Sequence, residues 1–337
     1  MKAVGYRKSL PVEHEHALID LDIPAPEPQG RDLLVEVKAV SVNPVDTKVR
    51  RNTEPPAGEY KILGWDAAGV VRAVGPDVTL FKPGERVWYA GTIARPGSNS
   101  ELQLVDERIV GPMPHSLDFA HAAALPLTSV TAWELLFDRL RIEQGDKPTN
   151  THLLIIGAGG GVGSIMVQLA RQLTGVTVIG TASRPDTQAW VRELGAHHVI
   201  DHSKPLTDEL RRIGIAQVEY VASLTHTDAH FAHAVEALAP QGKFALIDDP
   251  APIDVRLLKR KSLSLHWELM FTRSLFETPD MIEQHRILKN VAQLVDRGVL
   301  RTTLAEHYGL INAHNLRRAH AMLESGRARG KIVLEGF

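Results

Sequence analysis

The chain has 337 residues, a formal net charge of −2 and no cysteine. The missing cysteines exclude disulfides, thiolate nucleophiles and metal sites built on thiolates. The sequence contains neither a block of like charges nor an apolar run near the ~20 residues that cross a bilayer, so it favours neither a nucleic-acid nor a membrane partner. A domain typically has ~100–200 residues, so the length predicts two domains, and the composition is compatible with a cytoplasmic globular protein.

The first part of the chain, up to about residue 125, consists of short apolar runs separated by turn signals. The runs include Val35–Val42, Gly69–Val74 and Arg86–Tyr89, and the turn signals include Pro24–Pro28 and Pro83-Gly84. Short strands with frequent turns are typical of a β-rich, barrel-like domain.

The pattern then changes to alternating strands and helices, beginning with a predicted helix at Ser129–Leu140. This alternation indicates βαβ units and a parallel sheet with both faces covered, which is an α/β fold. The predicted strands are Leu153–Ile156, Val176–Thr181, His198–Asp201, Val218–Ala222 and Lys243–Ile247, and the predicted helices are Gly163–Leu173, Asp186–Leu194 and Asp228–Leu238.

The last part of the chain predicts two helices and one strand. The helices cover Pro279–Arg297 and Leu316–Glu324, and the strand covers Lys331–Leu334. A single late strand cannot form a domain, so we expect it to return to the first domain. The sequence therefore predicts a first domain at 1–126, a second at 127–270 and a returning segment at 271–337.

A glycine-rich segment joins the first strand of the second domain to its first helix. Glycines let the backbone approach a pyrophosphate, and the helix N-terminus offers N–H groups and a favourable dipole. A second strand follows about 20 residues on, which is the context that such a site requires, whereas a P-loop is disfavoured because no Gly-Lys-Ser/Thr follows. The predicted dinucleotide-binding residues here are Gly157, Gly160, Gly161, Val162 and Gly163.

The end of the second strand indicates which dinucleotide binds. An NAD site places Asp or Glu there to hold the ribose hydroxyls. This strand ends without a carboxylate before Asp186, and Ser183 and Arg184 occupy the position instead. A guanidinium and a hydroxyl suit a 2′-phosphate, so we predict NADPH. The alternative is that Arg184 is a solvated loop residue.

Further motifs occur at Asn43–Asp46, Gly64–Gly69, Gly84–Val87, Ala124–Thr128, Thr131–Glu134, Leu194–Ala196, Val199–Asp201 and Ala239–Lys243. With the glycine-rich segment, these motifs resemble the medium-chain dehydrogenase/reductase superfamily from Met1 to Phe337. The most similar branch is the zinc-free quinone oxidoreductases, with the bacterial group called zinc-type alcohol dehydrogenase-like. The resemblance implies a GroES-like catalytic domain, a doubly wound Rossmann domain, and a homodimer formed through the edge strand 262–271.

The chain departs from the zinc-dependent members of that superfamily at the metal ligands. Asn43 stands where those enzymes have a cysteine, and Trp65-Asp66 replaces their His-Glu pair. An amide and an indole are poor ligands for Zn²⁺, so we predict no zinc. His226, His230 and His233 share one helix face, which we interpret as a polar surface, although a metal site there is the alternative.

Without a metal, a substrate that readily accepts a hydride is favoured: a quinone or an α,β-unsaturated carbonyl. Asn43 is predicted to offer amide donors to the substrate, Asp46 to support the Asn43 loop, and Thr128 to face the cofactor or substrate, with an N-cap role as the alternative for Thr128. Tyr60, Trp65, Trp88, Phe271 and Phe276 are the predicted substrate pocket, with a core role as the alternative for either tryptophan. The resemblance adds Leu224, Thr225, Ile247 and Lys331 on the cofactor side.

Two other functions remain open at this point. One is a zinc-type alcohol dehydrogenase with atypical ligands, which metal analysis would distinguish. The other is a non-catalytic NADPH-binding sensor, which would bind the cofactor without oxidising it.

Overall fold

The computed structural model describes all residues from Met1 to Phe337, which divide into two compact units. Unit 1 comprises Met1–Val130 and Phe271–Phe337, and unit 2 comprises Thr131–Met270. The division falls inside helix α3 (Pro126–Trp133), whereas the boundary predicted after residue 126 lies at the start of that helix. None of the helices combines the length and apolar character needed to span a bilayer.

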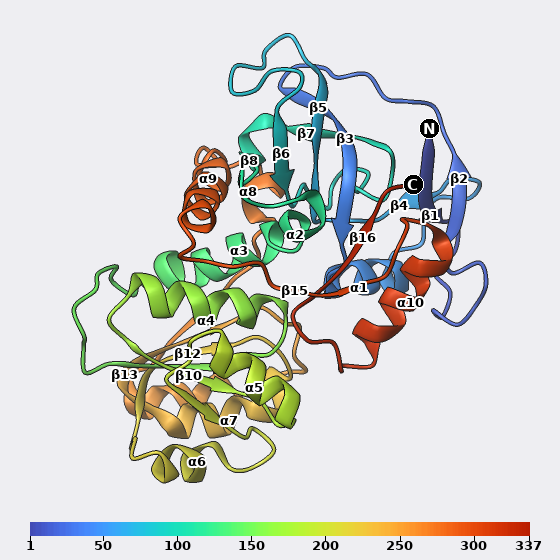
Figure 1. Ribbon diagram of the computed structural model, residues 1–337. Coiled ribbons are helices and arrows are strands. Elements are labelled where there is room, and N and C mark those ends of the chain that lie inside the picture. Colours follow the sequence, from blue (N-terminus) through green and yellow to red (C-terminus); the bar gives the residue numbers. More distant parts are fainter. The chain divides into compact units, whose positions relative to one another are not determined.

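Unit 1 is built on β-sheet, as the turn-rich sequence predicted (Figure 1). A seven-stranded sheet has the order β15-β16-β3-β5-β6-β8, with β7 also paired to β3, and a small sheet has the order β2-β1-β4. Alternate residues of β3 are buried because successive side chains of a strand point to opposite faces. The strands are β1 (Lys2–Tyr6), β2 (Ile19–Asp22), β3 (Asp32–Ser41), β4 (Lys61–Ile62), β5 (Ala67–Val74), β6 (Arg86–Tyr89), β7 (Leu102–Asp106), β8 (Val110–Pro112), β15 (Leu304–His307) and β16 (Lys331–Glu335).

The last strand of the chain, β16, pairs antiparallel with β3, so two segments nearly 300 residues apart lie side by side. Helix α9 packs on β8, and α1 packs on α10. The helix predicted at Pro279–Arg297 is shorter, because residues 278–282 form turns before α9 begins. The helices of this unit are α1 (Pro44–Asn52), α2 (Phe119–Ala123), α3, α8 (Thr272–Leu275), α9 (Glu283–Asp296) and α10 (Ala313–Glu324), with a 3₁₀ turn η1 (Glu107–Ile109).

Unit 2 is a six-stranded parallel sheet of order β11-β10-β9-β12-β13-β14, which confirms the predicted doubly wound α/β fold. The strands are β9 (His152–Ile156), β10 (Thr177–Thr181), β11 (His198–Ile200), β12 (Val218–Ser223), β13 (Leu238–Leu246) and β14 (Ser264–Trp267). The helices are α4 (Gly161–Leu173), α5 (Pro185–Glu193), α6 (Leu206–Arg212) and α7 (Thr227–Ala237), with a π-helical turn η2 (Glu134–Arg139) and a 3₁₀ helix η3 (Val255–Lys261).

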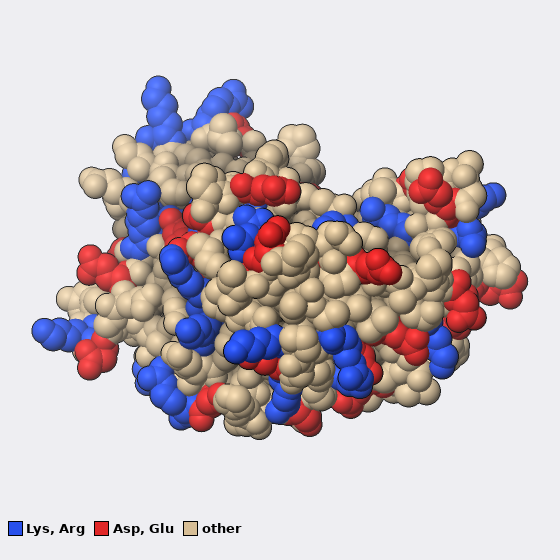
Figure 2. Space-filling view, turned by 90° about the horizontal axis from the view of Figure 1, so that it is seen from above, with Lys and Arg blue, Asp and Glu red and all other residues tan.

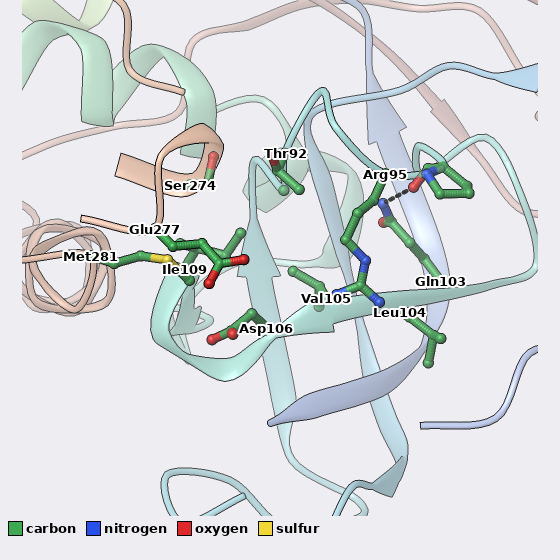
Figure 3. A pocket seen from close by; sticks show the side chains of 12 residues that line it. Thr92, Arg95, Gln103, Leu104, Val105, Asp106, Ile109, Ser274, Glu277 and Met281 are labelled. Atoms are coloured by element: carbon green, nitrogen blue, oxygen red, sulfur yellow. Dashed lines mark hydrogen bonds between the residues drawn. The ribbon is translucent and has the colours of Figure 1, made fainter. Parts of the chain in front are cut away.

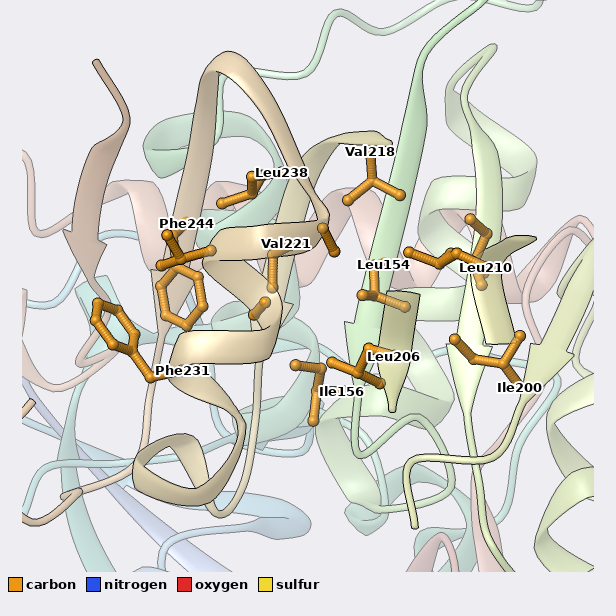
Figure 4. Packing of buried hydrophobic residues seen from close by; sticks show 14 of the residues in the cluster. Leu154, Ile156, Ile200, Leu206, Leu210, Val218, Val221, Phe231, Leu238 and Phe244 are labelled. Atoms are coloured by element: carbon orange, nitrogen blue, oxygen red, sulfur yellow. The ribbon is translucent and has the colours of Figure 1, made fainter. Parts of the chain in front are cut away.

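The core of unit 2 shows why its strands read as continuous apolar runs. Leu154 and Ile156 of β9 pack with α6 and α7 on one face of the sheet (Figure 4). Their neighbours Leu153 and Ile155 are equally buried, and alternation places them on the opposite face. Both faces of this sheet are therefore covered, as a parallel sheet requires.

Charged side chains of both signs are interspersed over the face seen in Figure 2.

The edge strand predicted at 262–271 is shorter than expected. Only Ser264–Trp267 forms β14, and it pairs on one side with β13 and ends the sheet.

Candidate active site

The glycine turn between β9 and α4 has the geometry of a ligand cradle. Gly157 has φ +85°, and its N–H donates to Thr181 Oγ1 at 3.1 Å. A Cβ at Gly163 would lie 2.5 Å from Ala158 Cα, so glycine there allows helix and strand to approach closely. The N–H groups of the first turn of α4 have no intrahelical acceptor, and the helix dipole adds positive potential there.

Gly160 differs from Gly163 because the fold itself does not require a glycine at this position. Its φ is −79°, and a Cβ would meet only Gly157 O at 3.6 Å, an ordinary contact. A side chain at Gly160 would therefore fit the chain, and the glycine leaves open space at the N-terminus of α4. Such space is what a pyrophosphate needs, so the turn fits a dinucleotide.

Most other predicted cofactor residues lie at the carboxyl edge of the same sheet. Arg184 is the N-cap of α5 just beyond β10, and its Nε lies 3.4 Å from Asp186 Oδ1. The Leu224 N–H donates to Ile156 O at 3.0 Å, and a Cβ at Gly157 would lie 2.9 Å from the Thr225 methyl group. Ser183 is exposed, and Ile247 directly follows β13.

Lys331 is the exception, because it lies in unit 1 with its side chain 3% exposed. Its ammonium donates to Val42 O at 3.0 Å, Asn43 Oδ1 at 2.6 Å and Asp66 Oδ2 at 2.8 Å. All three donor positions of the ammonium are thus used within the chain. We call Lys331, Asn43, Asp66 and Asp46 the lysine centre.

The other members of the lysine centre are also satisfied internally. Asn43 is 2% exposed, and its Nδ2 donates to Asp66 Oδ2 at 3.2 Å and to Ser41 O at 3.4 Å. Asp66 Oδ1 accepts the N–H of Leu127 at 3.0 Å, at the start of α3. The whole amide of Asn43 is thus engaged within the chain, and its contact with a substrate stays a prediction.

Asp46 holds the backbone on both sides of the lysine centre. Its carboxylate accepts the N–H of Asn43 at 2.7 Å and that of Gly64 at 2.9 Å. Burial raises the pKa of Asp46 to about 7, although both hydrogen bonds and the charge of Lys331 act in the opposite direction. This geometry agrees with the supporting role that the sequence suggested for Asp46.

Thr128 lies within α3 rather than ahead of it, so the N-cap alternative is wrong. Its hydroxyl donates to Leu125 O at 3.1 Å, and the side chain is buried. The role of capping α3 belongs to Asp66, which sequence reasoning assigned only to a lost metal site. The carboxylate is 61 residues away in sequence, so no local signal could have revealed it.

The predicted aromatic pocket does not form as one group. Trp65 and Phe271 meet edge to face with ring centroids 6.4 Å apart, and the Trp65 indole donates to Thr92 O. Trp88 is fully buried in β6 and belongs to the core. Tyr60 lies 37% exposed beside Arg7, and Phe276 is 75% exposed. Trp65 is also fully buried, so burial favours the core alternative for both tryptophans.

Thr92 also lines a small pocket of unit 1 (Figure 3). Arg95 borders it on one side, and Asp106 and Glu277 border it on the other. Its volume of about 70 Å³ is well below the ~300 Å³ of small ligand sites. The Arg95 guanidinium is already held in two hydrogen bonds by Asp32, so the pocket offers no free charged group there.

Known proteins resemble this chain over its full length. A family model described as alcohol dehydrogenase GroES-like domain matches residues 29–115, and one described as zinc-binding dehydrogenase matches 194–334. A zinc-type alcohol dehydrogenase-like protein of Staphylococcus aureus is 38% identical over 341 residues, 99% of each chain. The chain belongs to the medium-chain dehydrogenase/reductase superfamily.

Two solved structures extend this comparison. A protein of Rhizobium etli described as a putative zinc-dependent alcohol dehydrogenase is 60% identical, with a TM-score of 0.96 over 100% of this chain and 98% of that one. A quinone oxidoreductase of Pseudomonas syringae is 26% identical, with a TM-score of 0.82 over 99% of each chain. These likenesses agree with a quinone-oxidoreductase-like branch of the superfamily.

The zinc implied by some of these names does not fit the residues of this chain. In zinc-dependent members these positions hold the metal ligands, and here Asn43, Trp65 and Asp66 present an amide, an indole and a carboxylate instead of thiolate and imidazole. The amide and carboxylate oxygens already accept hydrogen bonds from an ammonium ion. Zn²⁺ at this position would have to displace that buried positive charge. The structure elsewhere brings together no three His, Asp or Glu side chains able to hold a metal.

Proposed function

We propose that this protein is an NADPH-dependent reductase that delivers a hydride to a quinone or an α,β-unsaturated carbonyl without a catalytic metal. The observation that carries this proposal is the Lys331 ammonium, which fills the place of the metal charge and uses up the oxygens around it. A metal would polarise an alcohol or a plain carbonyl. Without one, a substrate that already carries an electron-poor acceptor is favoured.

The choice of NADPH rests on the end of β10. Ser183 and Arg184 follow this strand, and the nearest carboxylate, Asp186, comes after Pro185. Arg184 is partly exposed, so its guanidinium can reorient toward a phosphate. Forked donors of this kind suit phosphate, whereas a carboxylate in their place would select ribose hydroxyls.

NADPH supplies the hydride when it is bound, and the chain supplies binding and orientation. The first turn of α4 offers N–H groups to the pyrophosphate, while Leu224 and Thr225 line the adjoining edge of the sheet. The lysine centre fixes the loops around Asn43 and Trp65, because its hydrogen bonds join β16, α1 and α3. Its role in this proposal is positioning.

One panel of assays tests the reaction class. NADPH consumption is measured with several quinones and several 2-alkenals, and NADP⁺ reduction is measured with several alcohols, each with and without chelator. We expect turnover with quinones or alkenals that chelator leaves unchanged. Alcohol oxidation abolished by chelator would instead establish the zinc-type alcohol dehydrogenase that the names of the relatives suggest. Tight NADPH binding without any turnover would favour the sensor.

The protein is also proposed to form a homodimer through β14. This strand ends the sheet, and Trp267 and Leu269 are 53% and 50% exposed beside it. An apolar edge strand is an aggregation liability unless another strand covers it. Light scattering should therefore show a dimer that Trp267→Lys dissociates, while Leu310→Lys, a 55% exposed residue of unit 1, leaves it intact. A monomeric wild-type protein would refute this part of the proposal.

A further inference from the structure

Three histidines gather at the carboxyl edge of unit 2, beside the residues proposed to hold the cofactor. His202 follows β11, while His226 and His230 lie at the start of α7. The rings of His202 and His230 meet edge to face with centroids 5.7 Å apart. His226 has φ +49°, an uncommon backbone conformation for a non-glycine residue.

A hydrogen-bond chain connects His202 to the glycine turn. Thr181 Oγ1 accepts the N–H of Gly157 at 3.1 Å and lies 3.0 Å from His202 Nδ1. Since the hydroxyl already accepts one hydrogen bond, it can donate its own proton to Nδ1. The neutral ring then carries its hydrogen on Nε2, where it can donate to a ligand. Thr181 is three residues before Arg184, so the chain links the turn to the phosphate-binding position.

The charges around these rings disfavour their protonated forms. Burial, with the charges of His226 and Arg184, lowers the pKa of His202, against the attraction of Asp201. Burial and the three histidines 202, 226 and 233 lower the pKa of His230, against the attraction of Asp228. Both carboxylates are engaged elsewhere, since Asp201 accepts from Ser203 and Asp228 from the N–H of Ala229. A strong anion among these groups would reverse the balance.

We propose that His202 and His230 form, with Arg184, a proton-linked site for the phosphate on the adenosine ribose of NADPH. This inference rests on the proposed NADPH dependence and deepens it. Arg184 provides a permanent charge, and the two imidazoles together take up about one proton when the dianionic phosphate arrives. NADH has no such phosphate, so its binding leaves both rings neutral. Cofactor selectivity is therefore set by pH as well as by sequence.

Linkage gives the size of the effect. A group whose pKa rises by one unit on binding strengthens binding by up to ~10-fold as the pH falls through that range. We expect NADPH affinity to increase about 10-fold between pH 8 and pH 6.5, with NADH affinity nearly constant. Below pH ~6 the phosphate itself takes up a proton, which sets the lower end of the range.

The test is calorimetry of NADPH and NADH binding to the full-length protein at several pH values, in two buffers of different ionisation enthalpy. The expected result is uptake of up to about one proton per NADPH and none per NADH. The variant His202→Asn/His230→Gln should lose the uptake and bind NADPH with the same affinity across this range. His233→Gln, an exposed histidine on the same helix, is the matched control and should retain the uptake.

The outcomes separate this inference from the function on which it rests. Unchanged NADH affinity in the double variant shows that the glycine turn is intact. NADPH preferred over NADH equally at every pH, without proton uptake, would overturn the inference and leave the proposed cofactor standing. Equal affinities for NADPH and NADH at every pH would overturn both. Proton uptake that persists in the double variant would assign it to other groups and also overturn the inference.

Discussion

The lysine centre of unit 1 and the glycine turn of unit 2 treat their polar groups in opposite ways. In the lysine centre, the ammonium, the amide and the carboxylates are buried and bonded to one another. In the glycine turn, the N–H groups of the first turn of α4 have no intrahelical acceptor, and the N-cap Gly160 leaves open space where a Cβ would lie. Buried polar groups that hydrogen-bond to one another stabilise the fold, whereas backbone N–H groups without an acceptor in the chain can bind a ligand.

This contrast corrects the usual expectation for the superfamily. The lysine centre, which consists of a lysine, an asparagine and two aspartates, lies at a position that holds a reactive metal in some members. The lysine centre joins β16 to α1 and α3, so the C-terminal strand contributes to the same hydrogen-bonded group as the loop at Asn43.

The largest effect on stability is expected in the lysine centre. Lys331→Met removes the cation from a buried carboxylate and amide, and breaking a buried pair typically costs ~3–5 kcal/mol of stability. Chemical denaturation measures this loss directly. Lys38→Met is the control, because Lys38 is only partly buried, pairs with Glu36 on β3 and should change stability by less than ~0.5 kcal/mol. Equal, small losses for both would show that the lysine centre does not hold the fold together.

The next effect concerns cofactor choice. Arg184→Ala removes charge-assisted hydrogen bonds to the 2′-phosphate, and such bonds contribute roughly 1.5–3 kcal/mol. We expect NADPH affinity to fall ~10- to 100-fold and NADH affinity to stay nearly constant. Fluorescence titration with both cofactors measures the ratio. A parallel loss for NADPH and NADH would place Arg184 outside the phosphate site.

Substitutions in the glycine turn test whether it binds the pyrophosphate of the cofactor. Gly160→Ala adds a methyl group that the chain accommodates but a pyrophosphate would meet. Overpacking typically costs ~1–3 kcal/mol, so both cofactors should bind ~5- to 100-fold more weakly while the melting temperature is retained. Gly163→Ala should behave differently, because its Cβ would lie 2.5 Å from Ala158 Cα and destabilise unit 2 itself. Normal cofactor affinity in Gly160→Ala would show that no pyrophosphate lies at this turn.

The smallest effect comes from a buried histidine that lacks the partners found in the lysine centre. His320 of α10 is fully buried, neither ring nitrogen has a hydrogen-bond partner, and burial lowers its pKa to about 3. The unfolded chain takes up this proton near pH 6.5, so stability from neutral His320 is present above that pH and is lost as the pH falls toward about 3.

We expect the wild type to lose about 1 kcal/mol between pH 7.5 and pH 5.5 through this group. His320→Leu should remove that part of the pH dependence, and denaturation at both pH values measures it. A variant with the wild-type slope would assign the acid sensitivity to other residues.

The amino-acid sequence by itself determined the alternation of strands and helices in unit 2 and the position of its glycine turn. It could do so because local periodicity and glycine content specify these features within about 30 residues. The predicted helix at Gly163–Leu173 starts two residues later than α4. Glycines stand on both sides of this boundary, so the residue types there do not indicate where the helix begins. The sequence also indicated that Asn43 and Asp66 replace metal ligands.

Only the tertiary structure decided what those residues do instead. Lys331 lies 265 residues from Asp66 in sequence, and its ammonium reaches the carboxylate only because β16 pairs with β3. The capping of α3 by Asp66 and the chain from Gly157 through Thr181 to His202 likewise join residues far apart in sequence. Local propensity specifies a strand or a turn. A buried charged group, however, needs a hydrogen-bond partner, and the tertiary fold determines which residue provides it.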